Sequence, residues 1–115
     1  MKELTERQKA ALKAMKNRLA DVRSYPTAEA FAAAWERKYP AAGNAGRYER
    51  MCALIRWEMA QENKVNFPNM FHHTRTIREL ADKGYIRIVS EERHDFNMHL
   101  FILEILQEEG ESKDE

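Results

Sequence analysis

The chain has 115 residues, with 19 Lys and Arg, 19 Asp and Glu, 43% hydrophobic residues and one cysteine, Cys52. This length favours a single domain with one hydrophobic core, and a lone cysteine excludes an internal disulfide and indicates a reducing, cytoplasmic location. No stretch is long and apolar enough for a membrane span, and the first seven residues lack the apolar core of a secretion signal.

Charge is distributed unevenly along the sequence. Residues 107–115 hold five acidic side chains and one basic side chain, a net charge of −4, so residues 1–106 carry +4. We therefore expect a mildly basic domain over residues 1–106 and a disordered acidic tail over residues 107–115. A charge of this size neither requires nor excludes a nucleic-acid partner.

The first half of the chain predicts helices. Thr5 and Gln8 have the spacing of a capping box, and apolar residues follow at helical intervals, so a helix is expected from about Thr5 to Ala20. Pro26 and Thr27 begin a second predicted helix, which ends at residues 39–40. The Gly43-Asn44-Ala45-Gly46 segment that follows is expected to be a loop.

A third helix is expected from Arg47 to about Asn63. Its predicted core-facing side is formed by the apolar residues Met51, Leu54, Ile55 and Met59. Aromatic residues are expected to build the core around the second and third helices, namely Phe31, Trp35, Tyr48 and Trp57.

The second half of the chain predicts a helix and a β-hairpin. After a turn at residues 64–67, a fourth helix is expected over residues 68–83, with Pro68 in its first turn and Gly84 as a left-handed cap. Residues 85–89 and 98–105 then alternate as strands around a turn at residues 93–97. The fold class is therefore mainly α with a small antiparallel β-hairpin, the layout of a winged helix-turn-helix. The segment 101–106 is apolar on both faces, which fits either a strand buried in the monomer or a face covered by a second subunit.

Two stretches resemble the DNA-binding domain of the LexA repressor family. Residues 1–8 (MKELTERQ) are similar to the opening of that domain, and residues 68–69 and 80–89 (PN and LADKGYIRIV) are similar to its recognition helix and first wing strand. Residues 25–62 have no counterpart in it. The resemblance implies a winged helix fold that binds double-stranded DNA.

A helix over residues 68–83 that enters the major groove would present its polar side to the bases. Asn pairs well with adenine and Arg with guanine, so the side-chain types suit this task. The predicted base contacts are Asn69, His72, His73, Arg75, Thr76 and Arg78. The predicted phosphate contacts are Lys64, Lys83, Arg87 and Arg93. Acidic residues in the same hairpin, Glu91, Glu92 and Asp95, argue against a wing that grips the minor groove.

Two hypotheses about function follow. The first is a small transcriptional regulator that binds DNA as a homodimer. The second is a protein-binding module, such as a phage-type or plasmid-type inhibitor or adaptor, which the acidic hairpin and the surplus of apolar residues near the C-terminus favour. No nucleophile with a base and no phosphate-binding glycine loop is present in the sequence, so neither catalysis nor a cofactor is expected. His72 and His73 would point about 100° apart on a helix, so no metal site is expected.

Overall fold

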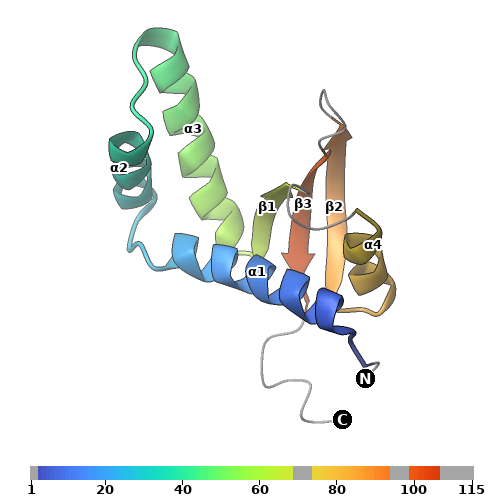
Figure 1. Ribbon diagram of the computed structural model, residues 1–115. Coiled ribbons are helices and arrows are strands. Elements are labelled where there is room, and N and C mark those ends of the chain that lie inside the picture. Colours follow the sequence, from blue (N-terminus) through green and yellow to red (C-terminus); the bar gives the residue numbers. More distant parts are fainter. Residues whose placement is uncertain (1–2, 69–73, 94–98, 107–115) are drawn as a thin grey trace.

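The computed structural model describes residues 3–68, 74–93 and 99–106. Within these ranges the chain forms four α-helices and a three-stranded antiparallel sheet in the order β1–β3–β2. Figure 1 shows that α1, α4 and the sheet form a body, while α2 and α3 form a helical hairpin that projects from one end of it. The prediction of a mainly helical fold with an antiparallel hairpin is confirmed. None of the helices in the described ranges is long and apolar enough to cross a membrane.

The first two helices begin where threonines cap them. α1 spans Glu6–Arg23 and α2 spans Ala28–Lys38. The Thr5 hydroxyl accepts a hydrogen bond from the Gln8 backbone N–H at 3.1 Å, and the Gln8 side chain accepts one from the Thr5 N–H at 3.0 Å. The Thr27 hydroxyl accepts a bond from the Ala30 N–H at 3.0 Å. Each cap satisfies backbone donors that the first helical turn leaves open, so both predicted helix starts are confirmed.

The third helix begins and ends earlier than the predicted range of Arg47 to about Asn63. α3 spans Gly43–Ala60, so the segment expected to be a loop at residues 43–46 is its first turn. A Cβ atom on Gly46 would lie 2.6 Å from the carbonyl oxygen of Ala41, so only glycine allows this close approach of the backbone. The glycines that suggested a loop are therefore compatible with a helix, because Gly46 lets the first turn of α3 lie close to the backbone of Ala41.

The predicted start of the fourth helix at Pro68 is wrong, and so is the predicted turn at residues 64–67. Residues Lys64–Pro68 form the strand β1, α4 spans Thr74–Asp82, and residues 69–73 lie outside the described part of the chain. Val65 and Phe67 are buried, whereas Lys64, Asn66 and Pro68 are half-buried, which is the alternation of a strand with one face on the core. β1 pairs only with β3, and an edge strand tolerates the missing N–H of Pro68.

The other two strands form the predicted hairpin. β2 spans Ile86–Arg93 and β3 spans His99–Ile105, and they pair antiparallel with an irregularity between Ile88 and Ser90. Gly84, just before β2, has a φ of 88°, as expected of a left-handed cap. The predicted turn at residues 93–97 and the predicted acidic tail at 107–115 lie largely or wholly outside the described residues.

The core lies between one face of the sheet and the helices α1 and α4. β3 is the central strand, and its alternate residues Phe101, Leu103 and Ile105 are buried. One face of segment 101–106 is therefore buried in the monomer, whereas on its other face Ile102 is half-buried and Leu106 is 45% exposed. α1 runs along the base of the sheet and α4 lies beside β2 (Figure 1). The largest fully buried side chains are Met15, Ile77, Leu80, Ile86, Phe101, Leu103 and Ile105.

Candidate functional site

The predicted base-contacting residues divide between two faces of α4. Ile77 and Leu80 are fully buried and anchor the helix to the core, as predicted. Thr76 is only 2% exposed, so the prediction that it faces outward is wrong. It shares the buried face because it lies four residues before Leu80, which is one helical turn. Arg75 and Arg78 do face outward, whereas Asn69, His72 and His73 lie outside the described residues.

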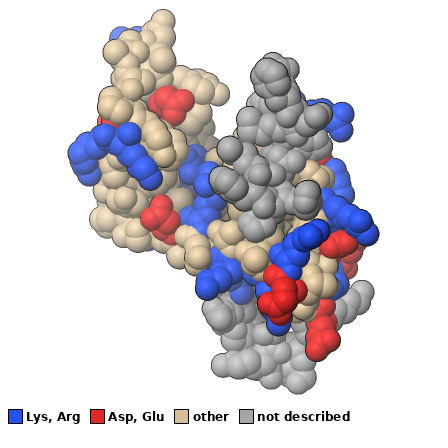
Figure 2. Space-filling model, viewed as in Figure 1, with Lys and Arg blue, Asp and Glu red and all other residues tan. Residues whose placement is uncertain are grey.

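Carboxylates of the chain itself pair with the outward-facing arginines. The Arg78 guanidinium lies 2.8 Å from both carboxylate oxygens of Glu91 on β2. Arg75 lies 3.4 Å from Glu79, one turn further along α4. Figure 2 shows red acidic side chains among the blue basic ones on this side of the molecule. The described outer face of α4 is therefore close to electrically neutral rather than a basic ridge.

Other cations predicted to contact phosphate also have partners within the chain. Arg87 pairs with Glu104 across the β2–β3 ladder at 2.7 Å, and Lys64 pairs with Glu62 at 3.0 Å. The Lys83 ammonium donates to the carbonyl oxygen of Glu3 and to the side-chain oxygen of Gln8, both at 2.7 Å. Arg93 is exposed at the end of β2. Phosphate contacts by Arg87 or Lys64 would compete with existing ion pairs.

A polar junction joins α1 to α4. Gln8, which is 4% exposed, donates from its side-chain nitrogen to Glu79 at 2.9 Å, while its side-chain oxygen accepts from Lys83. The hydrogen bond from Gln8 lowers the pKa of the Glu79 carboxyl, and the charges of Arg75 and Lys83 add to this effect. Lys83 therefore positions α1 against the end of α4 instead of projecting from it.

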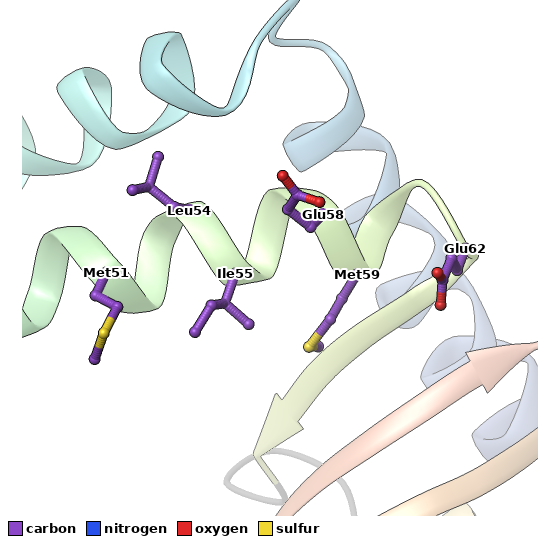
Figure 3. Close-up of a pocket in the computed structure, with 6 residues that line it drawn as sticks. All are labelled: Met51, Leu54, Ile55, Glu58, Met59 and Glu62. Atoms are coloured by element: carbon purple, nitrogen blue, oxygen red, sulfur yellow. The ribbon is translucent and has the colours of Figure 1, made fainter.

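The most distinctive exposed surface lies on α3. Met51 and Ile55 are 51% and 50% exposed, and Met59 is half-buried one turn further on. Figure 3 shows these three side chains projecting from the same side of α3, and we refer to them as the apolar stripe. The stripe borders a recess of about 510 Å³, whose lining also includes Leu54, Glu58 and Glu62. Single exposed apolar residues are ordinary, but a row of them at helical spacing marks a candidate interaction surface.

The sequence placed these residues on the wrong side of the helix. Met51 and Ile55 were predicted to face the core, but Ala53 and Ala60 are the fully buried residues of α3, at 1% exposure each. Trp57 packs against the core on the same side and donates from its indole N–H to the carbonyl oxygen of Tyr25 at 3.0 Å. α3 has apolar residues on more than one face, and this excess was the signal for an exposed surface.

The predicted aromatic core around α2 and α3 is correct in part. Phe31 is buried, and Trp35 and Trp57 are partly buried against the core, but Tyr48 is 61% exposed. Tyr48 lies one turn before Met51 and extends the exposed apolar surface towards the start of α3. Among the described residues, no group of three or more His, Cys, Asp or Glu is placed to hold a metal ion.

The sequence matches no protein-family model and no curated protein, and the structure matches no solved structure. The resemblance to the LexA repressor family therefore stays a prediction.

Proposed function

We propose that this chain is a non-catalytic protein-binding module whose apolar stripe on α3 docks an amphipathic helix of a partner protein. The observation that carries the proposal is the exposure of Met51 and Ile55, two large apolar side chains one helical turn apart. They lie on α3, part of the helical hairpin that projects from the body (Figure 1). An amphipathic helix laid against an apolar surface is a common mode of peptide recognition.

The charge around the stripe indicates the chemistry of the partner. Glu58 and Glu62 line the same recess as the stripe, near the C-terminal end of α3, and the ion pair with Lys64 partly neutralises Glu62. The C-terminal end of a helix carries a partial negative charge, which adds to these carboxylates. A partner helix with Lys or Arg beside its apolar residues therefore complements this surface, whereas an acidic helix is repelled.

Duplex DNA is the second candidate ligand. A winged helix is compatible with the sheet order β1–β3–β2 and with the position of α4 directly before the β2–β3 hairpin. The ion pairs of Arg75, Arg78 and Arg87 weigh against it, because each would lose a carboxylate partner on binding phosphate. One fold serves many functions, so the fold alone does not distinguish the two ligands. The ion pairs on α4 and the exposed apolar stripe on α3 support a protein partner.

Binding of model peptides tests the proposal. We would measure the fluorescence anisotropy of a labelled amphipathic peptide made of Leu and Lys, and of a matched peptide made of Leu and Glu, at one ionic strength. The Leu/Lys peptide is expected to bind more tightly. A Met51→Ser, Ile55→Ser double variant is expected to weaken its binding about tenfold or more, because both apolar contacts are lost. The control is Val89→Ser, at an apolar position on β2 that is 38% exposed.

Three results would overturn the proposal. The first is equal binding of both peptides, or binding that the double serine variant leaves unchanged. The second is concentration-dependent dimerisation that the double variant abolishes while the peptides do not bind, since the stripe would then contact a second copy of the chain. The third is tight, salt-dependent binding of duplex DNA that Arg75→Ala weakens, which would assign the function to α4.

A further inference from the structure

A second cavity lies where α1, α2 and α3 meet. Its volume is about 310 Å³, and none of the residues that line it belongs to the apolar stripe. Arg18 and Asp21 of α1, Lys38 of α2 and Arg56 of α3 are its charged lining residues. Three cations and one carboxylate give the lining a net charge of +2.

Within the described ranges, Arg56 has a buried side-chain donor that no protein group satisfies. Its guanidinium lies over the Trp35 ring at 4.5 Å and near the Phe31 ring at 5.5 Å. The Arg56 Nε atom is buried without a hydrogen-bond partner, and no ion pair with Arg56 is found in the described part of the chain. Burial, together with the charge of Arg18, lowers its pKa to about 10. A buried donor without a hydrogen-bond partner destabilises the fold. A bound ligand that accepts this hydrogen bond would remove the penalty.

The neighbouring charges leave room for an anion. The Nε of Arg18 donates to the carbonyl oxygen of Asn66 at 2.5 Å, and one terminal nitrogen of Arg18 donates to the side-chain oxygen of Asn66 at 3.5 Å. A guanidinium has five N–H groups, so donors remain after these two bonds. Of the nearby carboxylates, Asp21 lines the cavity, and Glu49 accepts a hydrogen bond from the Trp35 indole at 3.1 Å. The cations outnumber these two acids, so an added negative charge is stabilised.

We propose that this cavity binds a small organic anion, a carboxylate or phosphate monoester attached to a planar apolar body. The charged group pairs with Arg56 and Arg18, and the planar body packs against the aromatic wall formed by Tyr25 and Tyr39. A volume of about 310 Å³ is at the lower end of ordinary small-molecule sites, which fits a single-ring ligand. This site is independent of the peptide-docking surface on α3.

Tryptophan fluorescence provides the test. The chain has two tryptophans, so Trp57→Phe leaves Trp35, which stacks on Arg56, as the reporter. We would titrate this variant with benzoate and with phenyl phosphate, and compare inorganic phosphate and the neutral benzyl alcohol. The two aromatic anions are expected to change the Trp35 signal and raise the unfolding temperature, and the neutral alcohol is expected to do neither.

Two variants separate the proposed site from adventitious binding. Arg56→Met removes the cation but keeps an apolar side chain, and it is expected to weaken anion binding about ten- to a hundredfold. Arg50→Met is the control, because Arg50 lies on the same helix but pairs with Glu36 at 3.3 Å outside the cavity. Affinity unchanged by Arg56→Met, equal binding of benzyl alcohol, or no response to either aromatic anion would overturn the proposal.

Lys38→Met serves if Arg56→Met does not fold. Lys38 is exposed at the cavity, so its replacement leaves the core unchanged. A several-fold loss of affinity for benzoate, with a weaker dependence on salt, supports the site. Identical titrations for Lys38→Met and the wild-type chain would contradict it.

Discussion

Replacement of Ile55 by alanine tests whether the apolar stripe is surface or core. Full burial of an isoleucine side chain contributes about 1.5–3 kcal/mol. Ile55 keeps 50% of its surface exposed, so its contacts contribute about 0.8–1.5 kcal/mol by the same measure. Alanine favours the helix by a few tenths of a kcal/mol. The expected net loss in the free energy of unfolding is therefore about 0.5–1 kcal/mol.

Leu80→Ala is the matched comparison, because Leu80 is fully buried on α4. It is expected to cost about 2–5 kcal/mol, since it leaves a cavity in the core. Urea unfolding followed by circular dichroism measures both losses, and two protein concentrations tenfold apart reveal any contribution from self-association. A loss of about 2 kcal/mol or more for Ile55→Ala, at both concentrations, would place Ile55 in the core and refute this account of α3.

Three further predictions concern the body of the protein. Thr5→Ala removes the hydroxyl that caps α1, and it is expected to lower the free energy of unfolding by about 1 kcal/mol in urea titrations. The hydrogen bond from Gln8 lowers the pKa of the Glu79 carboxyl in the folded chain. The ionised carboxylate therefore stabilises the fold at pH values above the pKa that Glu79 has in the unfolded chain, and this stabilisation is lost as the pH falls through its pKa in the folded chain. The unfolding temperature of wild type should therefore fall more steeply than that of Glu79→Gln below about pH 5, and parallel curves would contradict this. Gly46→Ala is expected to lower the unfolding temperature, because its Cβ would lie 2.6 Å from the Ala41 carbonyl oxygen, whereas an unchanged temperature would mean that the backbone shifts easily.

Local signals in the sequence predicted the helix starts well. The Thr5 and Thr27 caps and the left-handed Gly84 depend on residues within one turn of each other, so neighbouring residues suffice to identify them. β1 was missed because it holds only two buried apolar residues, Val65 and Phe67, and because it begins with Lys64 and ends with Pro68. Its pairing with β3, more than thirty residues away, stabilises it, and a local pattern does not contain that contact.

The surfaces were harder to predict than the helices. α3 carries apolar residues on more than one face, and tertiary contacts decide that Ala53 and Trp57, rather than Met51 and Ile55, pack on the core. Tertiary contacts also decide which charged side chains form ion pairs, and the sequence does not show these contacts. Arg78 was predicted to be available to DNA, but its partner Glu91 lies thirteen residues away on β2 and becomes a neighbour only in the folded chain.

Methyl NMR on the methionines tests the docking surface most directly. Met51 and Met59 lie in the apolar stripe, while Met15 on α1 is fully buried. Adding the Leu/Lys peptide to protein labelled at its methionine methyl groups is expected to shift the Met51 and Met59 signals and leave Met15 in place. Unmoved Met51 and Met59 signals, with the peptide bound or duplex DNA bound elsewhere, would contradict the assignment of α3 as the binding surface.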